Sequence, residues 1–359
     1  MAFTAGEVTN ISNAALDFYL NKGDTFKQSI QPKPLLKMME SSAKSFPSGK
    51  GNISLAVKGD YGAGGVNDHV VGYTHNDSVG FYTPANIKRV NYPWREHHIG
   101  LTLTHTELKI DGISVTDEEG NGSSTSNHSD REVTVLVNLL QDKLEDFGEQ
   151  YSRNMNALLW GDGVADPKAL AGMRSIILDV PNAGTTGGLA RTNTWWQNRA
   201  ATAAFGTAGG RGAITSATTN GGALIQFLQN EYRQLIRYGG RPTKFLAGSA
   251  FINAMEVELR ANGNYTMSGF KGEQDGAMGQ LRFGGTTIEY DPTLDDLGFT
   301  KRAYWWDPRH IYLMKMDGEW DHKFTPSRPY NQFVVYKSMT HTGQMVAQQL
   351  NASGVYDIA

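Results

Sequence analysis

Between positions 129 and 160 the apolar residues form a single helical stripe. They recur at steps of three and four, the spacing that places side chains on one face of an α-helix. Residues 129–132 (Ser-Asp-Arg-Glu) have the form of a capping box, and Gly161 suits a helix end. The pattern predicts one helix of about 30 residues, roughly 45 Å long. Its expected core side chains are Leu136, Leu140, Leu144, Phe147 and Tyr151.

Alternating apolar and polar residues predict strands on the N-terminal side of this helix. Residues 53–57 and 99–103 both alternate with period two, as strands with one covered face do. A glycine-rich stretch follows the first of them, at 58–65, and suits a region between strands. We therefore interpret residues 49–92 as a long hairpin.

The first 48 residues do not have the pattern of a compact domain. Short helical stretches are expected at 12–20 and from about residue 34, with a polar segment between them. Two helices of this size bury little apolar surface against each other. They need another surface, either on this chain or on a neighbour.

The C-terminal half mixes helical and strand patterns. Helices are expected near residues 222–238 and 249–260. Strands are expected at residues 244–247, 286–290, 303–306, 311–316, 333–339 and 344–349. The order lacks the regular strand–helix alternation of a doubly wound sheet, so the predicted fold class is α+β.

The composition removes several classes of function. With 33 Lys plus Arg against 36 Asp plus Glu, the chain lacks the basic excess of a dedicated nucleic-acid binder. It has no cysteine, which excludes disulfides, thiol nucleophiles and cysteine-ligated metals. No run of apolar residues is long enough for a membrane span, and the first residues lack the features of a secretory signal.

The search for catalytic or metal-binding chemistry gives weak candidates. The best metal candidate is His97 and His98 with His105, but adjacent strand residues point to opposite faces, so a packing or surface role is favoured. Two carboxylate clusters lie in polar contexts typical of solvated loops, and two tryptophan pairs are more typical of buried or interface positions. These clusters are Asp117-Glu118-Glu119 with Asp295-Asp296, and Trp195-Trp196 with Trp305-Trp306. We expect no catalytic, cofactor-binding or metal-binding residue, which favours a self-assembling structural protein over an enzyme.

The order of these segments resembles the major capsid proteins of tailed bacteriophages, which have the Hong Kong 97-type fold. The resemblance is carried by residues 12–20 with 31–36, by 139–147 running into 158–163 and 167–173, and by 241–249 (Arg-Pro-Thr-Lys-Phe-Leu-Ala-Gly-Ser). It covers the whole chain as an order of parts. The implied parts are an N-terminal arm (1–48), an extended loop (49–93), a peripheral domain around the long helix (94–172), an axial domain with return strands (173–335) and C-terminal strands (336–359).

The resemblance implies a non-enzymatic shell protein without cofactors. Copies would assemble into hexamers and pentamers of an icosahedral phage head in the virion, enclosing double-stranded DNA without sequence-specific binding. Assembly would take place in the host bacterial cytoplasm, with a portal protein and a separate scaffolding or decoration protein as further partners and no membrane. Some family members form a Lys–Asn cross-link between subunits, but nothing here identifies a partner for Lys58.

The arm and the hairpin are expected to contact neighbouring subunits. We expect a single chain to leave their apolar side chains exposed, so that roughly the first ninety residues are completed only by sister copies. The expected contact residues are Phe18, Leu35, Met38, Ile53, Leu55, Lys58 and Tyr61. The alternatives are an encapsulin-type compartment and, from another class, a carbohydrate-active hydrolase or binding protein that uses the tryptophan pairs and loop carboxylates.

Overall fold

The protein was analysed as a computed structural model. The structure describes residues 3–4, 31–49, 51–59, 72–78, 87–104, 106–107, 115–116, 130–164, 166–207, 213–214, 223–261, 281–324 and 334–359. The expected helix at 12–20 and the contact residues Phe18 and Tyr61 lie outside these residues. So do His105 and the carboxylates at 117–119.

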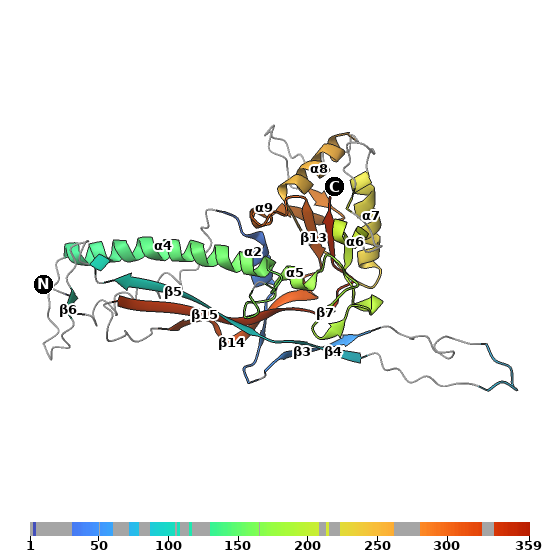
Figure 1. Ribbon diagram of the computed structural model, residues 1–359, viewed down its shortest axis with the longest axis horizontal. Coiled ribbons are helices and arrows are strands. Elements are labelled where there is room, and N and C mark those ends of the chain that lie inside the picture. Colours follow the sequence, from blue (N-terminus) through green and yellow to red (C-terminus); the bar gives the residue numbers. More distant parts are fainter. Residues whose placement is uncertain are drawn as a thin grey trace.

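The predicted long helix is present as α4 (Asp130–Trp160), which differs from the expected bounds by one residue. Figure 1 shows it running along the strands of one sheet. Phe147 and Tyr151 are buried in the main core, as their places on the apolar stripe predict. The side chains of Leu136, Leu140 and Leu144 lie outside the described set, so their role in the core stays a prediction.

The sheet beneath α4 has four strands in the order β2-β14-β15-β5. Their bounds are β2 (Lys44–Phe46), β5 (Arg95–Thr104), β14 (Ile311–Phe324) and β15 (Val334–Ala347). Strand β14 is longer than expected, and the two strands expected at 333–339 and 344–349 are the single strand β15. The residues between the two expected strands continue the hydrogen-bonded pairing of β15 with β5. Among them, His341 and Thr342 are buried, and buried backbone groups need such partners.

A second sheet has six strands in the order β11-β12-β10-β13-β16-β9. Their bounds are β9 (Arg199–Ala201), β10 (Lys244–Ala247), β11 (Arg282–Phe283), β12 (Thr286–Tyr290), β13 (Arg302–Trp306) and β16 (Gly354–Asp357). The helices α7 (Ala223–Ile236) and α8 (Ser249–Ala261) belong to this part of the molecule, at the upper right in Figure 1. Their apolar residues share a core cluster with β10 and β13.

The chain passes between the two sheets twice near its C-terminal end. It leaves the six-stranded sheet after β13, contributes β14 and β15 to the four-stranded sheet, and returns with β16. Residues 311–324 therefore pair outside the sheet that holds most of the segment 173–335. The last two strands, β15 and β16, pair in different sheets.

The shorter elements fill the connections and edges. Strand β1 (Phe3–Thr4) pairs with β6 (Val115–Thr116), and β7 (Thr185–Thr186) pairs with β8 (Leu189–Ala190). The short helices are α2 (Pro34–Ser41), α5 (Met173–Ile176), the 3-10 turn η2 (Thr194–Trp196), α6 (Ala203–Thr207) and α9 (Pro292–Asp296). Among the described helices, none has the length and apolarity needed to cross a membrane.

The two strands of the expected hairpin are β3 (Ile53–Lys58) and β4 (Ile87–Tyr92), which pair antiparallel from Ile53–Tyr92 to Lys58–Ile87. In Figure 1 this ribbon projects from the lower side of the body. Its base is buried in the main core through Val57 and Val90. The described strands confirm the hairpin at its base.

The expectation that a single chain leaves the arm and hairpin residues exposed is wrong for three of them. Leu35, Met38 and Ile53 are 0 %, 6 % and 5 % exposed, respectively, within their own chain. Helix α2 packs on α4, and its amphipathic face therefore finds its cover on the same subunit. Leu55 is half-buried against the same core. These buried side chains cannot serve as the contacts with neighbours that we expected.

Gly172, at the start of α5, makes a close approach that only glycine permits. A Cβ at this position would lie 2.3 Å from the carbonyl oxygen of Leu159 at the end of α4. We expect Gly172→Ala to lower the free energy of unfolding by about 1–3 kcal/mol, because the backbones must move apart. Gly51→Ala is the matched control, since a Cβ there meets no atom within 4 Å. Chemical denaturation of both variants checks this, and equal stabilities would contradict the packing described.

Candidate functional site

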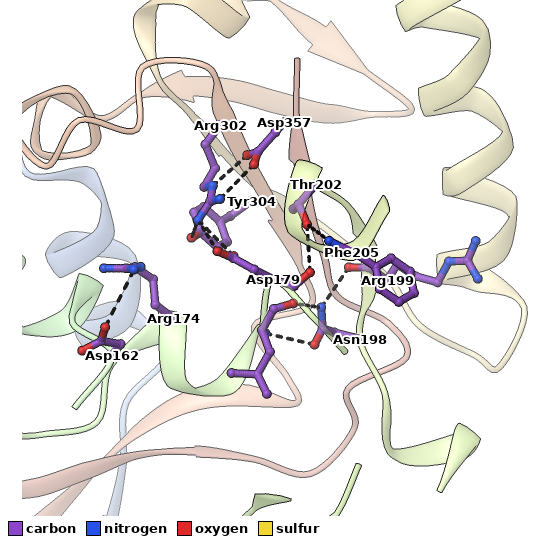
Figure 2. A network of polar contacts seen from close by, with 11 residues as sticks. Asp162, Arg174, Asp179, Asn198, Arg199, Thr202, Phe205, Arg302, Tyr304 and Asp357 are labelled. Atoms are coloured by element: carbon purple, nitrogen blue, oxygen red, sulfur yellow. Dashed lines mark hydrogen bonds and ion pairs between the residues drawn. The ribbon is translucent and has the colours of Figure 1, made fainter. Parts of the chain in front are cut away.

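A network of polar contacts at the six-stranded sheet centres on Arg302, at the start of β13 (Figure 2). Its Nε and Nη2 atoms donate to the two carboxylate oxygens of Asp357 at 2.7 and 2.8 Å. Its Nη1 atom donates to both oxygens of Asp179 at 3.0 and 3.1 Å. One guanidinium thus holds strand β16 and the segment after α5 together, with the bidentate geometry that makes such pairs strong.

The surroundings of Arg302 favour its charged form. Burial alone would lower the pKa of Arg302, but the hydrogen bonds with Asp357 and the nearby acidic groups outweigh burial and raise it. The guanidinium also lies over the ring of Phe299, 4.6 Å from its centroid. Since Arg302 is 8 % exposed, water screens these interactions weakly. We infer a rigid structural joint.

Asp179 and Asn198 continue this network into the loops below (Figure 2). The backbone oxygen of Asp179 accepts a hydrogen bond from Thr202 at 2.9 Å. The Asn198 amide accepts from the backbone nitrogen of Leu178 and donates to its carbonyl oxygen, both at 3.0 Å. Because the Asn198 side chain uses both its oxygen and its nitrogen, the backbone of Leu178 is held in one orientation.

A second buried arginine lies next to the ribbon's base. Arg191 is fully buried and donates to Thr186 Oγ1 at 2.9 Å, to Asn198 Oδ1 at 2.8 Å and to the carbonyl oxygen of Ile176. These three acceptors are neutral, and burial lowers the pKa of Arg191 to about 10. It therefore stays charged near neutral pH. We interpret it as a cation that organises the β7–β8 turn.

That turn holds the β4 edge of the ribbon against the body. The backbone nitrogen of Asn91 donates to the carbonyl oxygen of Gly187 at 2.9 Å, and the Tyr92 hydroxyl donates to the carbonyl oxygen of Ala347 at 3.1 Å. Gly187 has a positive φ of 58°, and a Cβ there would lie 2.9 Å from Val90. The ribbon thus leaves the body in a direction set by these contacts.

The end of α4 is joined to α9 by buried polar side chains. Asn156 accepts from the backbone nitrogen of Leu36 at 2.9 Å and donates to Thr293 Oγ1 at 2.7 Å. Trp160 donates to Asp291 at 2.8 Å, and Asp291 also caps α9. Burial raises the pKa of Asp291, which these hydrogen bonds partly offset. One helix end therefore positions both α2 and α9.

Among the described residues no group of three suitable metal ligands occurs, and His105 of the histidine candidate lies outside them. His97 instead accepts a hydrogen bond from the backbone nitrogen of Leu170 at 2.9 Å. It pairs across the strands with His341, which is buried and stacks on Tyr151 with ring centroids 4.7 Å apart. The packing interpretation of His97 is therefore the one that the contacts support.

The remaining candidates are Asp295 and the two tryptophan pairs, and their contacts lie within the subunit. Asp295 accepts from the backbone nitrogen of Ser249 at 3.0 Å and from the Tyr290 hydroxyl at 2.8 Å. Of the four candidate tryptophans, Trp196, Trp305 and Trp306 are fully buried, while Trp195 is half-buried. Only the half-buried Trp195 therefore presents surface for stacking.

Two of the residues considered from the sequence lie at one cavity. Lys58 and Trp195 both line a cavity of about 570 Å³ between β3 and the body, together with Tyr238, His310 and Gln349. The volume lies within the range of about 300–1,000 Å³ typical of ligand pockets. Sequence analysis did not find this place, because its walls come from positions far apart in the chain. It missed Arg302, Arg191 and Asn156 for the same reason.

No protein-family model matches the chain, and no curated protein matches it. Among solved structures, the capsid asymmetric unit of cyanophage A-1(L) matches with a TM-score of 0.60 and 13 % identity, covering 92 % of this chain and 94 % of that one. The capsid of the Myoviridae phage XM1 matches with a TM-score of 0.51 and 13 % identity over the same shares. The holo-SrpI encapsulin complex from Synechococcus elongatus PCC 7942 matches at a TM-score of 0.47, with 10 % identity and 92 % and 88 % coverage, too weak to carry an argument.

These comparisons confirm the expected fold class. The chain is an α+β protein with the fold of the tailed-phage capsid structures, over nearly its whole length. At 13 % identity the likeness is one of fold alone. The division into an arm, an extended loop and two domains with the expected boundaries stays a prediction.

We expect Arg302→Ala to destabilise the protein by about 3 kcal/mol, since it leaves Asp357 and Asp179 without their shared cation. Arg282→Ala is the control, because Arg282 is exposed on β11 and is expected to change stability by less than about 0.5 kcal/mol. Denaturant unfolding measures both. A loss no larger than that of the control would contradict the role of Arg302 as a joint.

His97 gives a pH dependence with a defined sign. Burial, followed by the charge of His341, lowers the pKa of His97 below its ordinary value of 6.5. The unfolded chain then binds this proton more readily, so stability is present above pH 6.5 and is lost as the pH falls below it. We expect His97→Gln, whose amide oxygen still accepts from Leu170, to flatten the stability profile between pH 7 and 5. Unchanged slopes in thermal unfolding would contradict this.

Proposed function

We propose that this protein is the shell subunit of a tailed-phage head. Copies would form hexamers and pentamers of a closed icosahedral capsid that encloses the DNA genome. The single observation that carries the proposal is the match to the cyanophage A-1(L) capsid over 92 % of this chain and 94 % of that one. A match over almost the full length of both chains supports a likeness of the whole subunit and not of one part alone.

The charge of the protein is compatible with this function. A formal net charge of -3 gives little sequence-independent attraction to DNA, which suits a container that must let its contents move. We further propose the virion as its location, assembly in the host cytoplasm, and a portal protein with a separate scaffolding or decoration protein as partners. The proposal includes no catalytic step.

The test is assembly of the purified protein. We expect size-exclusion chromatography and negative-stain microscopy to find closed particles, with hexamers and pentamers as smaller species. Deleting residues 1–30 is expected to leave a folded subunit that does not close shells. The cut preserves Gln31, which contacts Asp296 and Arg153, and leaves α2 on the body.

The composition of the particles separates the alternatives. Nuclease-resistant DNA inside particles from infected cells supports the phage head, whereas a packaged enzyme identifies a protein compartment. A monomer that stays compact at all concentrations and salts, with or without scaffolding protein, would contradict both. Normal shells formed by the deleted chain would show that residues 1–30 are dispensable for closure.

A further inference from the structure

The free edge of the ribbon forms one wall of the cavity described above. Ala56, Val57, Lys58 and Gly59 all line it. Successive side chains of a strand point to opposite faces, so four consecutive residues line one cavity only if the strand presents its backbone edge. Val57 agrees with this, since it lines the cavity although it is buried and belongs to the main core. We infer that peptide groups form part of this wall.

This edge has no strand partner in the described part of the chain, where β3 pairs with β4 alone. In an antiparallel pair, alternate residues direct both their N–H and their C=O groups away from the partner strand. The other edge of the ribbon is used differently, since Asn91 on β4 bonds to Gly187 of the body. The free hydrogen-bonding groups of the ribbon's base thus face the cavity.

The opposite wall carries groups that suit a polypeptide. It offers the amide side chains Gln348, Gln349 and Asn351, and it includes the exposed ring of Tyr238. The Gln349 amide nitrogen donates to Asn351 Oδ1 at 2.7 Å and to the Tyr238 carbonyl oxygen at 3.2 Å, which holds this wall in one arrangement. Amides pair with peptide groups and aromatic rings pack on side chains, so both walls match an extended strand.

We propose that this cavity, which we call the edge groove, binds an extended segment of a second copy of this chain, which adds a strand to β3. The proposal rests on the proposed shell function, which surrounds each subunit with identical neighbours. A groove on one copy that receives a different part of the next is a heterologous contact, the kind that closes subunits into rings. It also covers an edge that carries neither proline nor bulge, so that Lys58 is its protection against uncontrolled pairing.

The groove replaces the interface that we expected from the sequence. Ile53, Leu55 and Val57 pack in the subunit's own core, and the strand offers its neighbour hydrogen-bonding groups instead. Recognition through the backbone depends little on side-chain identity. Quasi-equivalent neighbours can therefore use the same edge at slightly different angles.

Photo-cross-linking tests the groove directly. The chain has no cysteine, so Tyr238→Cys can be labelled with a benzophenone maleimide at this position alone. The labelled protein is irradiated under assembly conditions, separated by denaturing electrophoresis and mapped by mass spectrometry. We expect a cross-link between two copies of the chain, from Tyr238→Cys to one extended segment of the neighbour.

A matched pair of variants on β3 tests the edge itself. Ala56→Glu places a larger side chain in the groove. Arg89 on β4 is the cross-strand partner of this position, and its charge is expected to attract the glutamate and keep β3 paired with β4. Ser54→Glu makes the same change two residues away on the same face, outside the groove. We expect Ala56→Glu to reduce the yield of the cross-link by about tenfold, equivalent to about 1.4 kcal/mol of binding. Ser54→Glu should leave it unchanged.

The outcomes separate this proposal from the shell function. Closed particles whose cross-links stay within one chain, or run to a different protein, would overturn the groove and leave the shell standing. A cross-link between copies without closed particles would support the groove and overturn the shell. Equal yields from the two glutamate variants would also overturn the groove. Neither particles nor cross-links between copies would overturn both.

Discussion

The rest of the structure depends on the contact between the end of α4 and the cap of α9. Asn156 and Trp160 are both fully buried there, and their polar atoms reach Thr293 and Asp291. A polar group buried without a partner costs about 1–3 kcal/mol, so these hydrogen bonds hold the helix end in one position relative to both sheets. The apolar residues of the same helix end belong to a core that includes strands of both. The long helix therefore acts as a frame for the whole subunit.

Arg302 reinforces this frame where the last strand returns to the six-stranded sheet. Its two carboxylate partners lie 55 and 123 positions away in the chain, so it joins segments that local structure leaves independent. Asn156 holds α2 on α4, so the described helices and sheets pack together within one chain. Several strands of the described residues have an unpaired edge, and that of β3 is the one that lines the cavity. This division suits the proposed shell function, in which a rigid body would set the geometry and the edge would make the contact.

The sequence predicted those features that repeat locally. The bounds of α4 followed from eight apolar residues on one stripe, and β10 and β12 lie where strands were expected, at residues 244–247 and 286–290. The predicted exposure of Leu35, Met38 and Ile53 in a single chain was wrong. An amphipathic pattern indicates that one face of an element is covered, but it does not indicate which part of the molecule covers that face. Strand β15 looked interrupted because polar residues fill its middle, and their burial came from tertiary pairing. The Arg302 joint and the edge groove left no local signal at all.

The central claim is that one chain builds its own body and leaves the β3 edge for a neighbour. Hydrogen–deuterium exchange of the unassembled and assembled protein tests it most directly, since it reports hydrogen bonding at each stretch of backbone. The account predicts that residues 147–160 are protected equally in both states, whereas residues 53–59 gain protection on assembly. Weak protection of residues 147–160 before assembly, or unchanged exchange at residues 53–59 after it, would contradict the account.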